Sequence, residues 1–194
     1  MKKYELTTET LQFAGRTLHR IKAVKDFDSI KAGEFGGWIE NEKNLSQDDN
    51  AWIYGNAMVF DNAMVFDNAK VYGNAKVYDN ANVSDYAKVY GNAEVYDNAN
   101  ISYYAKVYGN AVIKGDAIVH DAVDYIVFKN FWSSGRYFTW TSSNNKWSVG
   151  CFYGTSEELI KKAYADSEKS GREYERVVRY VESILADEKK EKSN

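Results

Sequence analysis

A six-residue alternation of small, β-branched and polar positions runs through the middle of the chain. From Asn50 to Asp121 an alanine recurs every six residues, and a valine or isoleucine follows it two positions later. Because strand side chains alternate between two faces, each alanine and its aliphatic partner point the same way. Gly-Asn or Asp-Asn usually comes next, and these residues tolerate the positive φ of tight turns. Each hexad therefore predicts a short strand and a corner, with alanine and valine facing inward.

Residues 70–87 and 88–105 indicate how the hexads stack. These two stretches of the sequence differ at only three pairs of positions, Lys76/Glu94, Val83/Ile101 and Asp85/Tyr103. A repeat of three hexads predicts three strands per coil, and neighbouring coils of such a stack lie about 4.8 Å apart. The region from Asn50 to Asp121 would then make four coils of a triangular prism that is roughly 20 Å tall.

The spacing of an aliphatic residue and a small residue four positions later resembles the signature of the hexapeptide-repeat, left-handed parallel β-helix family. Val71 with Ala75 and Val77 with Ala81 follow this pattern. The resemblance implies a left-handed coil, against the usual right-handed preference of crossovers. Many members of that family are trimeric acyltransferases that use a histidine as general base and bind an acyl-CoA between subunits.

A longer string resembles uncharacterised proteins of phages and prophages. Its parts here are GGWIE, NLSQ, NAWIYGNA and GCFYGT, which are spread over most of the chain. This second resemblance suggests a phage or prophage origin and implies no mechanism.

The segments that flank the repeat predict a cap and a second module. A solenoid needs caps because its end coils would otherwise expose apolar side chains and unpaired strand edges. After the repeat, alternating apolar residues predict strands, and Thr155 with Glu158 forms a capping box that opens a helix. The expected class is mainly β, a left-handed parallel β-helix with an N-terminal hairpin cap and a small C-terminal α+β module. The predicted parts are a cap at residues 1–32 and a solenoid with an irregular first coil at residues 33–121. A β-β-β-α-α module follows at residues 122–187, and a charged tail at residues 188–194.

Composition narrows the classes of function. The net charge of −3 argues against a dedicated nucleic-acid binder, and a single cysteine excludes an internal disulfide framework. No apolar run approaches the roughly 20 residues that span a bilayer. The opening MKKYELTTET turns polar too soon for a signal peptide. We therefore expect a cytoplasmic protein that has no contact with a membrane.

Outward-facing aromatic and methionine side chains are the main candidates for function. Several of them fall in the first complete coil and would form an exposed apolar belt, which is typical of an interaction surface. We therefore predict a protein partner. The alternatives are that stacked tyrosines only stabilise the coils, at about 0.2–1 kcal/mol per pair, or that a cap covers part of the belt. The candidate binding residues are Trp52, Tyr54, Met58, Phe60, Met64, Phe66, Tyr72, Tyr90, Tyr103, Tyr104 and Tyr108.

Two further hypotheses concern columns of charged residues on adjacent coils. Lysines and tyrosines recur together on the first face, as in surfaces where bases stack on rings and lysines meet phosphates, but three lysines are few for nucleic acid. One column of corner aspartates, Asp61, Asp79 and Asp97, could attract Ca²⁺. Such aspartates are more often ordinary turn residues, so we expect neither a metal nor a cofactor.

Catalytic candidates are few. His120 would face outward on the last coil, where it could act as a general base toward a neighbouring subunit, although Asp121 is its only evident carboxylate neighbour. Cys151 lies in an apolar strand pattern, and we expect it in the core. We assign no catalytic residue, and His120 is the runner-up.

These observations favour a non-catalytic interaction scaffold, encoded by a phage or prophage, that binds and, as a hypothesis, inhibits a host or defence protein. One alternative is a CoA-dependent acyltransferase of the trimeric hexapeptide type. Another is a binder of small nucleotides or nucleic acid on the Lys/Tyr face. A homo-oligomer, in particular a trimer, is expected by family analogy alone.

Overall fold

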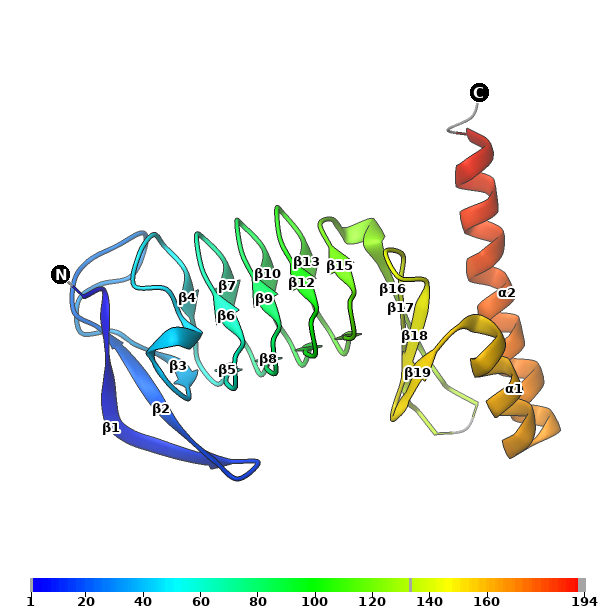
Figure 1. Cartoon of the computed structure of the whole chain (residues 1–194), viewed down its shortest axis with the longest axis horizontal. Helices are drawn as coiled ribbons and strands as arrows, with labels where there is room; N and C mark the ends of the chain where they lie inside the picture. The colour runs from blue at the N-terminus through cyan, green and yellow to red at the C-terminus, as the bar shows by residue number, and fades with distance from the viewer. Residues whose placement is uncertain (1, 133, 192–194) are drawn as a thin grey trace.

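The computed structural model describes residues 2–132 and 134–191 and shows an elongated molecule with three parts (Figure 1). A β-hairpin lies at the N-terminal end, a stack of coils forms the middle, and an antiparallel sheet with two helices lies at the C-terminal end. None of the helices in these two ranges is long and apolar enough to cross a membrane.

The coils follow the six-residue period of the sequence. Each hexad contributes a strand of two residues, and strands that are eighteen residues apart pair in parallel, so that Lys88 lies beside Lys70 and Lys106. This register confirms the three hexads per coil and the parallel β-helix architecture. The left-handed sense of the coil stays a prediction.

Three sheets form the three faces of the prism, and we number them in the order in which the complete coils visit them. Face 1 contains β4 (Trp52–Ile53), β7 (Lys70–Val71), β10 (Lys88–Val89) and β13 (Lys106–Val107). Face 2 contains β3 (Phe35–Ile39), β5 (Met58–Val59), β8 (Lys76–Val77), β11 (Glu94–Val95) and β14 (Val112–Ile113). Face 3 contains β6 (Met64–Val65), β9 (Asn82–Val83), β12 (Asn100–Ile101) and β15 (Ile118–Val119).

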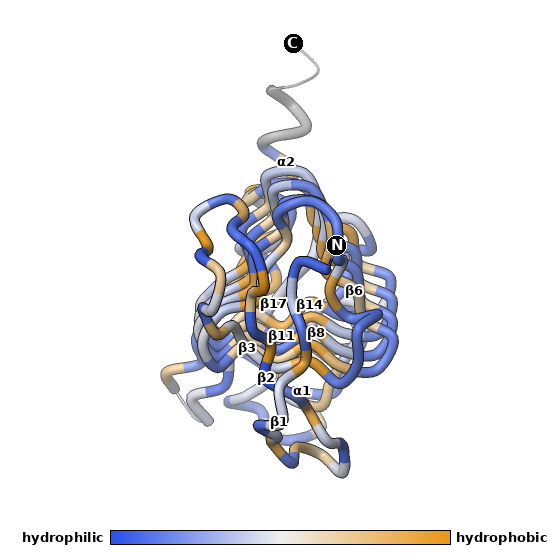
Figure 2. The backbone as a smooth tube through the Cα atoms, turned by 90° about the vertical axis from the view of Figure 1, so that its left-hand side faces the viewer, coloured by the Kyte–Doolittle hydropathy of each residue, from blue (hydrophilic) through white to orange (hydrophobic). Residues whose placement is uncertain are grey.

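The predicted inward columns form the core of the prism. Every repeat alanine from Ala51 to Ala117 is fully buried, and so is the valine or isoleucine that follows it two positions later, from Ile53 to Val119. Figure 2 shows the matching alternation of apolar and polar positions along the coils. Burial of each such aliphatic side chain stabilises the fold by about 1.5–3 kcal/mol.

The corners have the positive φ that their composition predicts. Gly73 has a φ of +74°, and a Cβ atom there would lie 3.0 Å from the backbone nitrogen of Gly91 in the next coil. Asp79 and Asp97 adopt the same left-handed conformation, which asparagine and aspartate tolerate best after glycine. Corner asparagines then form ladders between coils, as where the carboxamide of Asn74 donates to that of Asn92 at 3.2 Å.

The N-terminal hairpin extends the sheet of face 2. Its strands β1 (Tyr4–Phe13) and β2 (Arg16–Ala23) are antiparallel, and β2 pairs with β3, which is in turn parallel to β5. The irregular first coil continues through the short 3-10 helix η1 (Glu42–Asn44) to Leu45, which bridges to Val65 on face 3. Together these residues and the four complete coils give about five turns.

Buried polar side chains close the N-terminal end of the prism. The ammonium of Lys3 is enclosed and donates to the backbone carbonyl oxygens of Asp48 and Ala51, at 2.9 and 3.0 Å. The Tyr4 hydroxyl donates to the carbonyl of Leu45 at 2.7 Å. Burial lowers the pKa of Lys3 to about 8 and raises the pKa of Tyr4.

Hydroxyl groups of the C-terminal module close the other end, with at least one on each face. The Tyr125 hydroxyl donates to the carbonyl of Lys106 on face 1 at 2.9 Å. On face 2 the amide of Val112 donates to Thr139 Oγ1 at 3.0 Å, and on face 3 the amide of Ile118 donates to Ser143 Oγ at 2.8 Å. Strand edges that would otherwise template the pairing of another chain are thereby occupied.

The C-terminal module has four strands where three were expected. After the 3-10 helix η2 (Ala122–Asp124), an antiparallel sheet is followed by two helices, and one face of the sheet packs on them around Phe138, Trp147 and Leu159. The elements are β16 (Tyr125–Lys129), β17 (Tyr137–Thr141), β18 (Lys146–Val149), β19 (Phe152–Gly154), α1 (Ser156–Asp166) and α2 (Glu168–Glu191).

Two sequence-based expectations for this module have different outcomes. The capping box of Thr155 and Glu158 is confirmed, since the two residues exchange side-chain to backbone hydrogen bonds. The prediction that Cys151 lies in the core is wrong. Gly150, with a φ of +56°, turns the chain between β18 and β19, so Cys151 is exposed on the turn.

Candidate binding groove on face 1

A groove with a volume of about 1200 Å³ runs along face 1 and the corner that precedes it. It is lined by the lysine column of face 1, by tyrosines of the strands on one side of that column in the chain and of the corner on the other, and by loop residues of the N-terminal region and of the last coil. We call it the Lys–Tyr groove, and its lining residues are Asp28, Asn50, Tyr54, Asn68, Lys70, Tyr72, Tyr86, Lys88, Tyr104, Lys106, Asp121 and Ala122.

The three lysines of the groove differ in their partners. Lys70 Nζ donates to Asp28 Oδ2 at 2.8 Å and to the backbone carbonyl of Asn50 at 2.6 Å. This hydrogen bond also lowers the pKa of the Asp28 carboxyl group. Lys88 and Lys106 are exposed, and neither ammonium group has an ion pair within the described part of the chain. Two adjacent positive charges therefore stand uncompensated in the groove.

The tyrosines beside the lysines are stacked on one another. Tyr90 is stacked on Tyr72 and on Tyr108, with ring centroids 4.7 and 5.2 Å apart. On the other side of the groove, Tyr86 and Tyr104 are stacked at 5.3 Å. Both faces of the Tyr90 ring and one face of each of the other four rings are thus already in contact with protein.

Face 2 repeats the lysine and tyrosine positions but neutralises the charge. Glu94 takes the place of a lysine there, and its carboxylate lies 2.8 Å from Lys76 Nζ. Tyr78 and Tyr96 are stacked at 4.6 Å and largely covered. Burial, helped by Asp97, raises the pKa of Tyr96 to about 12, and burial also raises the pKa of Tyr78.

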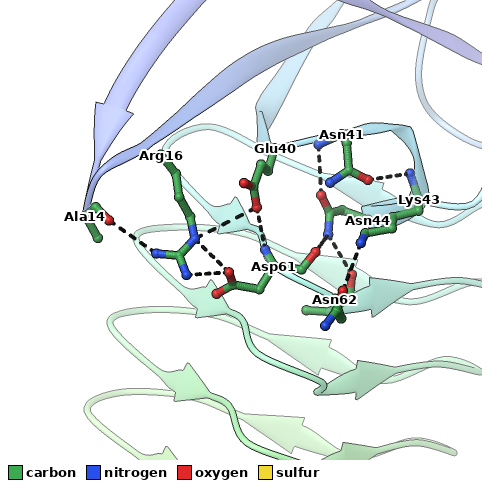
Figure 3. Close-up of polar contacts among 9 residues, drawn as sticks. Ala14, Arg16, Glu40, Asn41, Lys43, Asn44, Asp61 and Asn62 are labelled. Atoms are coloured by element: carbon green, nitrogen blue, oxygen red, sulfur yellow. Dashed lines mark hydrogen bonds and ion pairs between the residues drawn. The ribbon is translucent and has the colours of Figure 1, made fainter.

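The turn of the N-terminal hairpin lies against face 2 near its first coils. Arg16 Nε donates to Asp61 Oδ1 at 2.7 Å, and its guanidinium also donates to the carbonyl of Ala14 at 3.2 Å (Figure 3). Glu40 accepts from the backbone amide of Asp61 at 2.7 Å. These contacts hold the hairpin over Phe60, whose ring lies 5.4 Å from the Arg16 guanidinium.

The predicted apolar belt of the first coil is not continuous. Trp52 and Phe60 are buried, which makes their expected exposure wrong. Trp52 lies beneath Tyr4 and Phe27, and Phe60 lies beneath Phe13. Of the other candidate binding residues, Tyr54, Met58, Phe66, Tyr72 and Tyr90 are partly buried, whereas Met64, Tyr103, Tyr104 and Tyr108 are exposed.

The groove brings together only some of the predicted residues. Tyr54, Tyr72 and Tyr104 line it. Tyr86 was not among the predicted binding residues. The sequence did carry a signal for it, since Tyr86 replaces the asparagine that ends the corner in most hexads. Asp28 was also missed, and its position depends on the path of the loop between β2 and β3.

His120 and Tyr103 form a separate contact on the last two coils. Their rings meet edge to face, with centroids 4.7 Å apart, and both residues are exposed. The backbone amide of His120 donates to Asp124 Oδ2 at 2.7 Å. Its imidazole ring has no hydrogen bond to a carboxylate of residues 2–132 or 134–187, so no carboxylate within them orients it as a base.

The carboxylates of the corner aspartates accept hydrogen bonds from backbone amides of the next coil or from Arg16. Asp79 Oδ2 accepts from the backbone amide of Asp97 at 3.4 Å, and Asp97 Oδ2 accepts from that of Gly115 at 3.0 Å. Asp61 instead binds Arg16. In the parts of the chain that the structure describes, no group of three or more His, Cys, Asp or Glu residues could hold a metal ion.

Parts of the chain are similar to known proteins. Residues 51–65 and 105–121 match a family model described as the YdcK β-solenoid repeat. A relative from Escherichia coli (strain K12), described as the uncharacterised acetyltransferase YdcK, is 39% identical over 62 residues, which cover 28% of this chain and 19% of that protein. The chain thus spans about a fifth of the curated relative that it matches. With the stacked parallel coils, these similarities show a hexapeptide-type repeat β-solenoid, and the phage or prophage origin stays a prediction.

Proposed function

We propose that this protein is a non-catalytic binding scaffold that holds an anionic partner in the Lys–Tyr groove. The observation that carries the proposal is the pair of Lys88 and Lys106, which are neighbours in register and have no ion pair in the described chain. A host or defence protein with an acidic surface is the partner to test first.

The charges of the groove oppose folding unless a ligand compensates them. Two like charges about 4.8 Å apart repel by about 0.9 kcal/mol in water before salt screening. The chain could remove this repulsion with a glutamate, as Glu94 does beside Lys76 on face 2. On face 1 the repulsion is kept, and such a local cost is typical of functional sites.

Charge reversal tests the proposal directly. Three labelled probes are compared, poly-L-glutamate, oligo-dT and CoA, and we expect the double variant Lys88→Glu with Lys106→Glu to bind at least tenfold more weakly to any probe that binds the wild type. Binding is measured by fluorescence anisotropy at several salt concentrations, because a charge-driven complex weakens as salt rises.

The matched control is Lys161→Glu with Lys162→Glu. These lysines are adjacent and exposed on α1 and lie outside the groove, and the control changes the net charge by the same amount. Equal loss in both variants would mean a nonspecific charge effect and would reject the groove. Failure of all three probes to bind the wild type would reject the proposed function.

A second candidate is a CoA-dependent acyltransferase. It is favoured by the similarity to a protein described as an uncharacterised acetyltransferase. His120 would be its general base, and because no carboxylate in the described chain orients that ring, the site would need a second copy of the chain. This candidate predicts acetyl-CoA binding by calorimetry, transfer activity that is lost in His120→Ala, and an oligomer in solution. A monomer that does not bind CoA would contradict it.

A further inference from the structure

The stacking of the tyrosines limits what the Lys–Tyr groove can bind. Aromatic surfaces for single-stranded nucleic acid work by offering ring faces on which bases stack. Among the rings that line this groove, Tyr72 has one face covered by Tyr90, and Tyr86 and Tyr104 cover each other's inner faces. The rings stack in the direction in which the coils stack. Because stacked rings lie one above the other along that direction, the sides of each stack consist of ring edges and hydroxyl groups.

Ring edges and hydroxyls favour an anion over a planar base. The quadrupole of an aromatic ring places negative charge on its faces and positive charge on its edge. Tyrosine hydroxyls can donate to an anionic oxygen, and ammonium groups form charge-assisted hydrogen bonds with carboxylates. The exposed hydroxyl-bearing residues Tyr86 and Tyr104 line the same groove as Lys88 and Lys106.

The groove suits an extended segment with few charges. Side chains on one face of an extended peptide recur about every 6.7 Å, a spacing that two flexible lysines on adjacent coils can meet. Lys70 is already paired with Asp28 at one end, and Asp121 lies at the other end. The Asp28–Lys70 pair offers no free positive charge, and Asp121 would repel a negative group, so the groove favours two acidic side chains at its centre over a long polyanion.

We infer that the occupant of the Lys–Tyr groove is a short, extended acidic peptide segment of a partner protein, with carboxylates at Lys88 and Lys106. This inference rests on the proposed function and specifies its ligand. Nucleic acid is the competing occupant, and the test below separates the two.

The experiment compares three fluorescein-labelled probes by anisotropy on the full chain. The first is a ten-residue Gly/Ser peptide with two glutamates at positions i and i+2, the second is the same peptide with glutamines, and the third is a dT decamer. We expect the glutamate peptide to bind at least tenfold more tightly than either of the others.

Two variants sharpen the result. Lys88→Gln with Lys106→Gln should weaken the binding of the glutamate peptide at least tenfold. Tyr86→Phe with Tyr104→Phe keeps the rings but removes their hydroxyls, and it should weaken binding about two- to fivefold. Circular dichroism and thermal melting check that each variant is folded.

The possible outcomes distinguish a wrong peptide inference from a wrong proposed function. Tighter binding of the dT decamer, with loss in the lysine variant, would overturn the peptide inference and leave an anion-binding groove in place. Binding of the glutamate peptide that is unchanged in the lysine variant would also overturn the inference. If neither peptide nor dT binds, and poly-L-glutamate and CoA fail as well, the proposed function falls too.

Discussion

Face 1 and face 2 carry the same hexad pattern and yet differ in what they present to solvent. Both have lysine and tyrosine on either side of an inward valine, and both have a stack of tyrosines. On face 2 the charge is paired within the protein and Tyr78 and Tyr96 are largely covered. On face 1, Lys88 and Lys106 are open to solvent without a partner in the described chain.

The neighbours of each face cause the difference. The N-terminal hairpin continues the sheet of face 2, so its turn lies over that face, where Arg16 binds Asp61. At the other end, the ammonium of Lys114 lies between the rings of Tyr96 and Tyr153. On face 1, Asp28 pairs with Lys70, and within the described residues no ion pair reaches Lys88 or Lys106. A repeat thus determines where a side chain points, while the caps determine whether it meets solvent.

The largest expected effect is at the covered end of face 1. Trp52→Ala removes a fully buried ring from beneath Tyr4 and Phe27 and should lower the free energy of unfolding by about 3–5 kcal/mol. Tyr104→Ala, at an exposed position of the open part, should change it by less than about 0.5 kcal/mol. Urea unfolding of both variants measures the difference, and similar losses would mean that the two ends of face 1 are not distinct.

Exchange of the charges between the faces should have a smaller effect, with opposite signs. Glu94→Lys breaks the pair with Lys76 and gives face 2 the charge column of face 1, which should destabilise the protein by about 0.5–1 kcal/mol. Lys88→Glu places a carboxylate between Lys70 and Lys106 and should stabilise it by a similar amount, while it weakens binding of acidic peptide.

Thermal melting at low salt measures this pair of variants most clearly, since salt screens exposed charges. The shifts in Tm should have opposite signs and should both shrink in 0.5 M salt. If Lys88→Glu also destabilises the protein, the charges of face 1 are not a cost to folding, and the contrast between the faces loses its main support.

The repeat made most of the solenoid predictable, because its period specifies the face of every residue. The inward position of Val77 and the outward position of Lys76 follow from two numbers, the period of a strand and the length of a coil. The start of α1 was also readable, since the capping box of Thr155 and Glu158 is a local pattern. Contacts between residues near in sequence or one coil apart are those that a periodic sequence encodes.

Contacts made by the caps could not be read from the sequence. The burial of Trp52 depends on where the hairpin and the loop with Phe27 return, and these segments have no period. The turn at Gly150 that exposes Cys151 lies within a run that reads as one continuous apolar strand. In the groove, the lysine column could be predicted from the repeat, whereas the ion pair between Lys70 and Asp28 could not.

The smallest expected effect concerns pH and distinguishes the covered tyrosines of face 2. Burial raises the pKa of Tyr96 to about 12, so in the folded state this tyrosine stays protonated at pH values where the unfolded chain, with a pKa near 10, releases its proton. The unfolded state then binds fewer protons than the folded state, and stability falls between about pH 10 and 12.

Tyr96→Phe should remove the part of this fall that Tyr96 causes, which is less than about 1 kcal/mol at pH 11 because the ring is partly exposed. Urea unfolding of the wild type and the variant at pH 9 and pH 11 isolates the effect, since any change in packing is common to both pH values. An equal loss of stability in the two proteins would show that Tyr96 titrates as it does in the unfolded chain, and that face 2 is no more sheltered at this position than face 1.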